Sequence, residues 1–559
     1  MQQQSVIMKI ATSGQMQALD KTSIEEIGIP GVVLMENAGK GTVDAMEQEY
    51  GTVLGKTVCI FIGPGNNGGD GLVIARHIAQ RGGHPFLVYL ITPERLSGDA
   101  ETNAKICSRL GFIHYIVHHE DEVRQLKDLI RQLQFSHPVH SLVDALFGTG
   151  LSRNITGYFV DVIEFVNTLA DDRQWPVVAV DIPSGLCANT GTPLGCAVQA
   201  DLTVTYGLAK PGHFLHGGAM VGKLTVLDIS IPNRVIKQAG LRGHVLDRCE
   251  TAHRVQERRT ATHKGTYGHL LILAGSEGKT GAAVLAGKGA LHSGCGLVTL
   301  AVPAELNPIF ETSLPEAMTV PLPRSNKFSC AADYDLICEL LVGRDALVIG
   351  PGMGTAPETG VLVRRLYREL KLPMIIDADA LNLLAADPTI FKKSGGVRIL
   401  TPHPGEMSRL TGKTVADIQG DRLTAAGRLA KDLMHDEHEI VVVLKGAGTV
   451  LSSGKGDWAV NSSGNHGMAT GGMGDVLSGL IGGLLIQDYT PWDAAAIGVY
   501  QHGLAADILA KDRSHGFTAS EVAAALPHAF MRITNADCHL CPACKEPCVC
   551  SCSERLWQL

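Results

Sequence analysis

Residues 57–81 read TVCIFIGPGNNGGDGLVIARHIAQR, and this stretch decides the fold of the N-terminal half. It begins as a short apolar run, as in a buried strand, and it ends with the periodicity of a helix. The glycines between them let backbone amides approach an anion at a helix N-terminus, where the helix dipole also favours negative charge. The stretch therefore predicts a strand, a phosphate-binding turn and a helix, which together form one unit of a parallel α/β sheet.

The turn formally matches a dinucleotide-binding fingerprint, since Gly63, Gly65 and Gly68 have the spacing G-x-G-x-x-G. That fingerprint also requires an acidic residue about 20 positions later, at the end of the next strand, to bind a ribose hydroxyl. Here Glu94 comes late and follows a proline. An ordinary NAD-dependent dehydrogenase is therefore disfavoured.

Strand-like and helical segments alternate along the whole chain in two series, and this alternation indicates parallel sheets. The first series ends near Tyr206, and a new one begins at His269. The chain has 559 residues, whereas a single core stops growing near roughly 250 to 300 residues. We predict two α/β domains, at residues 1–240 and 263–530, with a charged linker at 241–262 and a tail at 531–559.

The composition disfavours a nucleic-acid or membrane protein. The formal net charge is −8, whereas nucleic acid or an anionic membrane attracts clustered Lys and Arg. Residues 1–10 lack the basic segment and apolar core of a secretory signal. The apolar stretch at 476–486 is too short to span a bilayer. We expect a soluble, cytoplasmic protein without nucleic-acid or membrane partners.

Two further predicted strands of the N-terminal half end in acidic residues, Asp144 and Asp181. Ligands of parallel α/β sheets bind in the crevice outside the carboxyl ends of the strands. A single Asp at such a position often only caps the next helix. Taken together with the glycine-rich turn, a shared binding site is the better interpretation.

Residues 465–479 read NHGMATGGMGDVLSG and form the strongest motif of the C-terminal half. Glycines before an apolar helix again make an anion-binding turn, and Asp475 falls in the first turn of that helix. Such an Asp can accept a proton from a hydroxyl group while backbone amides hold a transferring phosphoryl group. The turn is not a Walker A loop, because no Lys-Ser or Lys-Thr follows the glycines.

Other predicted strand ends of this half supply Asp, Asn, His, Glu and Lys, the side chains that a nucleotide and a divalent metal need. They lie at residues 350–354, 377–382, 401–406 and 445–449. His403 stands between two prolines, so it is either a rigid turn residue or a side chain that the turn fixes toward a ligand. We favour the ligand role.

The N-terminal motifs resemble the epimerase domain of NAD(P)H-hydrate repair enzymes over residues 8–232, through MENAG at 35–39, the turn at 63–71, Asp144 with 148–154, and VDIPSG at 180–185. The resemblance implies that the hydrated dinucleotide is bound by Asn66, Asn67, Gly68, Gly69, Asp70, Gly148, Thr149, Gly150, Leu151, Ser152, Arg153 and Asn154. It places Asp181 beside the altered nicotinamide, where a carboxylate can act as base or acid. It also implies a potassium ion on Asn67, Asp144 and Ser184, whose oxygen atoms suit a hard cation.

Residues 263–528 resemble the ADP/ATP-dependent NAD(P)H-hydrate dehydratases, which have a ribokinase-like fold. The match includes GS at 275–276, KTGAA at 279–283, and the segments at 350–354, 401–406, 445–449 and 471–478. The resemblance implies that Gly354, His403 and Asp475 contact the hydrated cofactor. It implies that the adenine nucleotide, with Mg²⁺, contacts Lys445, Gly446, Ala447, Gly448, Thr449 and Gly474.

The resemblance thus implies an α/β chain with a Rossmann-like N-terminal domain and a ribokinase-like C-terminal domain. One domain would interconvert the R and S forms of NAD(P)HX, and the other would dehydrate S-NAD(P)HX to NAD(P)H with release of AMP and phosphate. The fused arrangement favours ADP as the donor, and we expect a homo-oligomer. The alternative is a ribokinase-like kinase of a vitamin or other small molecule, fused to a non-catalytic nucleotide-binding module.

The chain contains 14 cysteines, and six of them crowd into the predicted tail. Four have the spacing C-x2-C-x2-C-x3-C of a ferredoxin cluster, and two more follow; they are Cys538, Cys541, Cys544, Cys548, Cys550 and Cys552. An iron–sulfur cluster, a zinc ion and an incidentally cysteine-rich tail all fit this pattern. We expect the tail to be dispensable for both reactions, because every predicted site residue precedes it.

Overall fold

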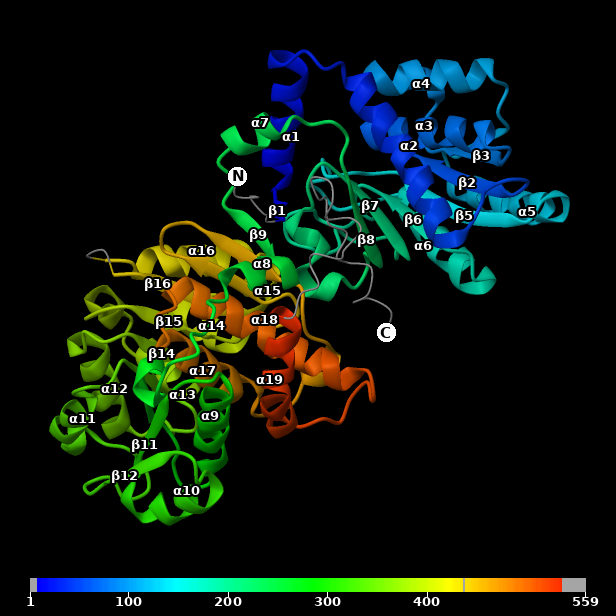
Figure 1. Ribbon diagram of the computed structural model, residues 1–559. Helices are drawn as coiled ribbons and strands as arrows, with labels where there is room; N and C mark the ends of the chain where they lie inside the picture. Colours follow the sequence, from blue (N-terminus) through cyan, green and yellow to red (C-terminus); the bar gives the residue numbers. More distant parts are fainter. Residues whose placement is uncertain (1–7, 436–437, 535–559) are drawn as a thin grey trace. The chain divides into compact units, whose positions relative to one another are not determined.

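The computed structural model describes residues 8–435 and 438–534, so the six cysteines of the predicted tail lie outside the described residues (Figure 1). The described chain forms two compact units, which meet in the sequence between Leu241 and Arg242. Each unit is built on a mainly parallel sheet covered by helices. This confirms the predicted α/β class of both halves.

The sheet of the N-terminal unit has the order β4-β3-β2-β5-β6-β7-β8, and its neighbouring strands pair in parallel. The strands are β2 (Thr57–Ile62), β3 (His84–Tyr89), β4 (His114–Ile116), β5 (Val139–Ala145), β6 (Val177–Val180), β7 (Leu202–Tyr206) and β8 (Lys223–Leu227). The chain adds β3 and β4 on one side of β2, then returns to add β5 on the other. Ligands of such sheets bind in the crevice beyond the carboxyl ends of the strands at this reversal, which here are β2 and β5.

Alternate residues of β2 enter two apolar cores, one on each face of this sheet. Ile60 packs with α1 (Ser13–Lys21), α2 (Gly31–Tyr50), α3 (Asn66–Gln80) and α4 (Gly98–Arg109). Phe61 packs with α5 (Glu120–Ser136) and α6 (Tyr158–Arg173). A strand buried on both faces has no polar alternation, which explains the apolar run of TVCIFI.

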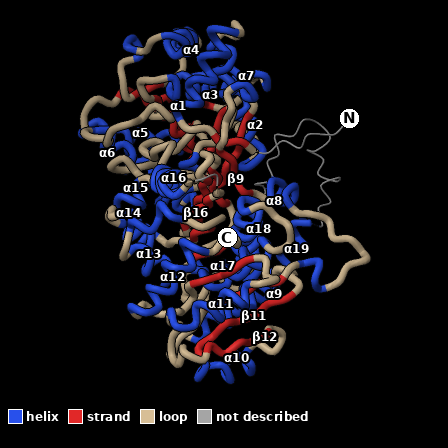
Figure 2. The backbone as a smooth tube through the Cα atoms, turned by 90° about the vertical axis from the view of Figure 1, so that its left-hand side faces the viewer, coloured by secondary structure: helices blue, strands red, loops and turns tan. Residues whose placement is uncertain are grey.

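The sheet of the C-terminal unit has the order β9-β18-β17-β16-β15-β14-β13-β10-β11-β12. The strands are β9 (Gly243–Leu246), β10 (His269–Leu273), β11 (Leu297–Pro303), β12 (Met318–Leu322), β13 (Ala346–Ile349), β14 (Met374–Ile376), β15 (Arg398–Leu400), β16 (Ile440–Leu444), β17 (Val450–Ser453) and β18 (Trp458–Asn461). The strands from β12 to β16 run parallel, and β17 is antiparallel to both of its neighbours. Both views place α10 (Asn307–Ser313) beside β12 at the outer edge of the sheet (Figure 1, Figure 2).

One face of this sheet is covered by helices α9 (Thr280–His292), α17 (Met473–Leu485), α18 (Pro491–Ala510) and α19 (Ala519–Thr534). The other helices that carry or support site residues are α12 (Pro357–Glu369), α13 (Ala378–Ala385), α14 (Pro404–Thr411) and α16 (Arg422–Leu433). Within the described residues, no helix is long and apolar enough to cross a membrane.

The segment predicted as a linker, 241–262, instead contributes structure to the C-terminal unit. Gly243 begins β9, which pairs in parallel with β18, and α8 (Arg248–Arg254) follows. A Cβ atom at Gly243 would lie 2.2 Å from the Trp458 ring, so glycine is needed for this close pairing. The partner strand is more than two hundred residues away in the sequence, so local patterns gave no sign of it.

Helix α17, which begins at the predicted phosphate-binding turn, is held against α9 by close contacts at glycine. A Cβ atom at Gly479 would lie 1.8 Å from the carbonyl oxygen of Ala286, and one at Gly289 would lie 2.2 Å from that of Val476. Both obstructing atoms are helix backbone and cannot swing away. The position of Asp475 in the first turn of α17 therefore depends on this helix pair.

We predict that Gly479→Ala lowers the free energy of unfolding of the C-terminal unit by about 1 to 3 kcal/mol, because the added methyl group forces the two helix backbones apart. Chemical denaturation measures the change. Gly281→Ala is the matched control, since no atom lies within 4 Å of its Cβ position in α9. Equal stability of Gly479→Ala and the parent would contradict the close packing.

Candidate functional sites

Two glycine-containing loops meet at the crevice of the N-terminal unit, as the sequence predicted. The loop after β2 leads through Gly63 into α3, and a Cβ atom at Gly63 would lie 1.7 Å from the carbonyl oxygen of Leu146, which follows β5. A Cβ atom at Gly148 would lie 3.1 Å from Oδ1 of Asn67. The predicted residues Asn66 to Asp70 and the start of the 148–154 segment are therefore neighbours in space.

Asp144 and Ser184 form a buried polar cluster behind these loops, and both side chains are 0% exposed. The Ser184 hydroxyl donates to Asp144 Oδ1 at 2.5 Å, and the Ser184 amide donates to Oδ2 at 2.7 Å. Burial raises the pKa of Asp144 to about 6, although hydrogen bonds from Ser184 oppose the rise. A buried carboxyl without a cationic partner among the described residues, with the Ser184 hydroxyl oxygen beside it, fits a hard cation.

Asp181, at the end of β6, has a left-handed backbone with φ of 65°. Its Oδ1 atom accepts hydrogen bonds from the Lys210 ammonium at 2.5 Å and from the Thr205 hydroxyl at 2.9 Å. Burial opposes the ionisation of Asp181, but the positive charge of Lys210 outweighs burial and lowers the pKa of Asp181. Asp181 is therefore an ionised carboxylate in a fixed orientation.

Lys210 and His213 were not found by sequence reasoning, although they complete the surroundings of Asp181. Lys210 is 1% exposed and His213 is 3% exposed. His213 donates from Nε2 to the Asp181 carbonyl at 3.0 Å, and its Nδ1 accepts the Lys210 amide at 3.0 Å. Both follow β7 in the segment AKPGH, where the only local signal was a basic residue beside a Pro-Gly turn.

Asp70, in the second turn of α3, differs in charge state from Asp181. Burial, followed by the negative charges of Asp181 and Asp20, raises the pKa of Asp70 well above its usual range. The surroundings therefore favour the protonated form of Asp70 and the ionised form of Asp181. Two acids with such different pKa values are what acid–base catalysis requires.

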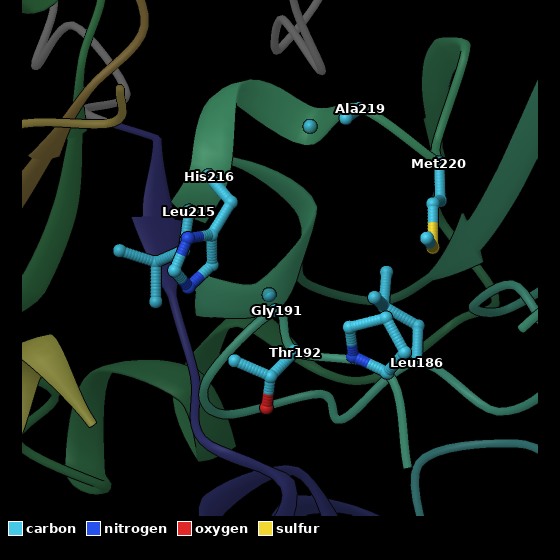
Figure 3. Close-up of a pocket in the computed structure, with 10 residues that line it drawn as sticks. Leu186, Gly191, Thr192, Leu215, His216, Ala219 and Met220 are labelled. Carbon is cyan, nitrogen blue, oxygen red and sulfur yellow. The ribbon is translucent and has the colours of Figure 1, made fainter. Parts of the chain in front are cut away.

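A small cavity of about 140 Å³ lies next to this site but does not contain the predicted dinucleotide contacts. In Figure 3, Leu215 and His216 lie on one side of it and Leu186 and Met220 on the other. Its walls are mainly apolar, and residues 66–70 and 148–154 do not line it. Ser152, Arg153 and Asn154 are instead exposed to solvent, where they remain accessible to a ligand.

The site of the C-terminal unit is centred on a lysine and an aspartate at the ends of β16 and β14. Lys445 donates to Asp377 Oδ1 at 2.6 Å and lies 3.9 Å from Glu406. Asp377 is 1% exposed and Glu406 is 5% exposed. The second oxygen of Asp377 is buried and has no hydrogen-bond partner in the described parts of the chain.

Asp475 faces this group from the first turn of α17. Burial, together with the negative charge of Asp377, raises the pKa of Asp475 to about 7, while Lys445 opposes the rise. A Cβ atom at Gly474 would lie 3.0 Å from the Lys445 ammonium. The structure therefore brings the predicted residues Lys445, Gly474 and Asp475 together.

His403 has the turn role that the sequence allowed, and its role as a ligand-binding side chain stays a prediction. Its Nδ1 atom accepts the amides of Gly405 and Glu406 at 3.0 and 3.4 Å, so the side chain caps the N-terminus of α14. In the neutral ring, Nε2 must then carry the hydrogen. The side chain is 52% exposed, which leaves it accessible to a ligand.

The segment 445–449 is shaped by Arg422 of α16, a residue that sequence reasoning missed. Arg422 is 2% exposed, and it donates to the carbonyl oxygens of Leu444, Lys445 and Gly448 at 3.0, 3.3 and 3.4 Å. These bonds hold the backbone of the turn through its carbonyl oxygens. The signal was absent because an arginine inside a helix pattern usually faces solvent.

Gly354 lies on the same side of the sheet and is positioned by Asp379, at the start of α13. Its amide donates to Asp379 Oδ2 at 2.9 Å, and the Lys279 ammonium donates to the same oxygen at 3.0 Å. Among the described residues, no three His, Cys, Asp or Glu side chains are arranged to hold a metal ion by themselves.

Comparison with known proteins assigns one family to each unit. Residues 31–212 match the family model described as the YjeF-related protein N-terminus, and residues 270–528 match that of NAD(P)H-hydrate dehydratase. The bifunctional NAD(P)H-hydrate repair enzyme Nnr of Moorella thermoacetica is 40% identical over 90% of this chain and 93% of its own length. The enzyme of the same name from Escherichia coli is 35% identical over 88% of each chain.

Among solved structures, the ADP/ATP-dependent NAD(P)H-hydrate dehydratase of Bacillus subtilis, co-crystallised with ATP and Mg²⁺, is 33% identical to this chain. The similarity covers 52% of this chain and 98% of the bacterial protein, with a TM-score of 0.45.

The buried Lys210–Asp181 pair gives a prediction about stability. Lys210→Met should destabilise the N-terminal unit by about 3 to 5 kcal/mol, because it leaves a carboxylate buried without its counterion. Urea unfolding measures this loss. Lys223→Met is the control, since Lys223 pairs with Glu49 at 2.6 Å in a more exposed place and should cost about 1 kcal/mol or less.

Adding Asp181→Asn to Lys210→Met should restore a large part of the stability, because the uncompensated charge is then removed. A double variant as unstable as the sum of the two single variants would show that charge pairing is not the cause.

Proposed function

Because this chain belongs to the family of bifunctional NAD(P)H-hydrate repair enzymes, we propose that it repairs hydrated nicotinamide cofactors with two separate active sites. The N-terminal unit interconverts the R and S forms of NAD(P)HX. The C-terminal unit, of the predicted ribokinase-like class, dehydrates the S form to NAD(P)H. The observation that carries the proposal is that each unit gathers its own set of buried ionisable groups at the carboxyl ends of parallel strands.

In the epimerase site, Asp181 is the base and Asp70 the acid. Inversion of the carbon that bears the hydroxyl group requires ring opening or proton movement at an electron-rich ring. The ionised Asp181 carboxylate accepts a proton, and the protonated Asp70 carboxyl can return one. Asn66 to Asp70 and Gly148 to Asn154 hold the dinucleotide, whose phosphates are drawn to the amides at the start of α3.

Asn67, Asp144 and Ser184 are the residues that would hold a potassium ion. The fit rests on the buried Asp144 carboxyl, the Ser184 hydroxyl beside it and the Asn67 oxygen near Gly148. When bound, the ion supplies a positive charge next to the dinucleotide loops. Asp144 and Ser184 meanwhile fix the backbone of the β5 loop, since the Phe147 amide donates to Ser184 at 2.8 Å.

In the dehydratase site, Asp475 accepts the proton of the nicotinamide hydroxyl while that oxygen attacks the β-phosphate of ADP. AMP leaves, and the hydroxyl becomes a phosphate ester. The carbon–oxygen bond then breaks and a proton leaves the neighbouring ring carbon, which restores the double bond and releases phosphate. Phosphorylation is needed because hydroxide is a poor leaving group. Gly354 and His403 hold the substrate.

Lys445 to Thr449 and Gly474 bind the adenine nucleotide. Asp377, whose second oxygen is buried without a hydrogen-bond partner among the described residues, would hold a Mg²⁺ ion, and that ion would supply positive charge to offset the charge of the nucleotide phosphates. We also propose that the phosphoryl donor is ADP and not ATP, and that the two sites bind K⁺ and Mg²⁺. The enzyme in this proposal is a cytoplasmic homo-oligomer. A non-catalytic N-terminal module is disfavoured, because such a module has no need of the buried Asp181–Lys210 pair.

Single substitutions should separate the two reactions. Asp475→Asn is expected to abolish ADP-dependent dehydration and leave epimer interconversion intact, because the carboxylates lie in different units. Asp181→Ala should stop interconversion, so that only one epimer is repaired rapidly. Chromatography of the two epimers, together with the absorbance of restored NAD(P)H, measures both reactions in the full chain.

Loss of both activities in a folded Asp475→Asn variant would contradict the two-site proposal. An Asp181→Ala variant that consumes both epimers at the parent rate would remove Asp181 from the mechanism. Glu25→Gln, which alters an exposed side chain, is the control for handling losses.

The pH dependence of dehydration should report Asp475. Its pKa is raised to about 7, and the ionised form is the one that accepts the proton, so the rate should rise with pH through about 7. Below that value the rate should fall about tenfold per pH unit. Single-turnover rates of S-hydrate dehydration across this range provide the measurement, and a pH-independent rate would exclude Asp475 as the base.

A further inference from the structure

The N-terminal segment that precedes the matched family model is attached to the loop that carries Lys210. β1 (Lys9–Ile10) forms an isolated parallel bridge with Ala209, and the amide of Ala11 donates to the Ala209 carbonyl at 3.0 Å. The next helix, α1, starts directly afterwards. The position of α1 is thus fixed relative to Lys210, the residue that follows Ala209.

Helix α1 presents Asp20 toward this loop. Asp20 follows Met16 by one helical turn, so the two side chains lie on the same face. Met16 packs against Gly207, because a Cβ atom added to Gly207 would lie 2.9 Å from the Cε atom of Met16. Leu19 is 2% exposed and anchors the same end of the helix. The Asp20 carboxyl group is therefore directed to the end of β7.

Asp20 is electrostatically coupled to the charged groups around Asp181. Burial raises the pKa of Asp20 to about 6, while the positive charge of Lys210 lowers it and Asp181 raises it. Asp20 in turn helps to raise the pKa of Asp70. The charged and titratable groups that face one another are Asp20 from α1, Asp70 from α3, Asp181 from β6, and Lys210 and His213 from the segment after β7.

The hydrogen bonds show how Asp20 acts on Lys210. The three donors of the ammonium group are used by Asp181, Thr205 and the carbonyl oxygen of Tyr206. Asp20 Oδ1 is shielded from solvent, and the described residues give it no hydrogen bond. Asp20 therefore influences Lys210 through its charge and not through a direct bond.

We propose that Asp20 is a positioning residue of the epimerase site: a second counterion that stabilises the ammonium group of the buried Lys210 and thereby holds the Lys210–Asp181 pair in its orientation. The inference rests on the proposed epimerase function. It extends the active site to a helix outside the segment 31–212 that the family model matches. Asp20 does not touch the substrate in this role, so it should affect turnover more than binding.

The test compares Asp20→Asn with Glu25→Gln, which removes a carboxyl group that is 62% exposed just beyond α1. Interconversion of the R and S hydrates by the full chain is followed between about pH 5 and 9. Asp20→Asn should lower kcat by roughly ten- to one hundred-fold, since small misplacements of a catalytic group have effects of this size. KM should stay close to the parent value, and Glu25→Gln should match the parent in both.

The pH profile distinguishes a positioning role from a structural one. Asp20→Asn should remove the inflection near pH 6 that the Asp20 carboxyl contributes, and Asp20→Glu, which restores the charge, should recover part of kcat. A folded Asp20→Asn variant with the parent kcat, or one with lower thermal stability but an unchanged pH profile, would overturn the proposal. If Asp20→Asn gives either of these overturning results while Asp181→Ala is inactive, only the role of Asp20 is disproved and the proposed epimerase function is unaffected. A parent chain that does not interconvert the epimers would overturn that function itself.

Discussion

Each unit depends on one buried ion pair between a lysine and an aspartate at the carboxyl end of its parallel sheet. In the N-terminal unit the pair is Lys210–Asp181, and in the C-terminal unit it is Lys445–Asp377. A buried charge is stable only when it is paired and hydrogen-bonded. Each pair therefore fixes the loops that supply it, and these are the loops that carry the remaining site residues.

The pairs also separate the charge states of the carboxyl groups around them. Asp181 stays ionised because Lys210 is bonded to it, whereas the nearby Asp70 is pushed toward the protonated form. Burial, together with the negative charge of Asp377, raises the pKa of Asp475 to about 7, and the positive charge of Lys445 opposes the rise. One fixed pair and one poised acid give each site a group that can exchange protons near neutral pH.

Local sequence patterns predicted the parts of these sites that local chemistry determines. The turns at Gly63 and Gly474 follow from glycine spacing before a helix, and Asp144, Asp181 and Asp475 follow from their place at strand ends or in a first turn. Lys210, Arg422 and Asp20 could not be found in this way, because each acts on a segment that only folding brings near. The strand β9 was missed for the same reason, since its partner β18 is distant in the sequence.

The two glycine-rich turns show why the same local device can support different chemistry. In both, a helix begins where backbone amides and the helix dipole attract an anion. In α17 the acid lies in the first turn, and under the proposed function a hydroxyl that loses its proton to Asp475 attacks a phosphoryl group held at the amides of that turn. In α3 the first turn contains no acid, and Asp70 lies one turn deeper, where it is coupled to Asp181. We propose that the position of one aspartate relative to the helix start decides whether such a turn only holds a phosphate or also transfers it.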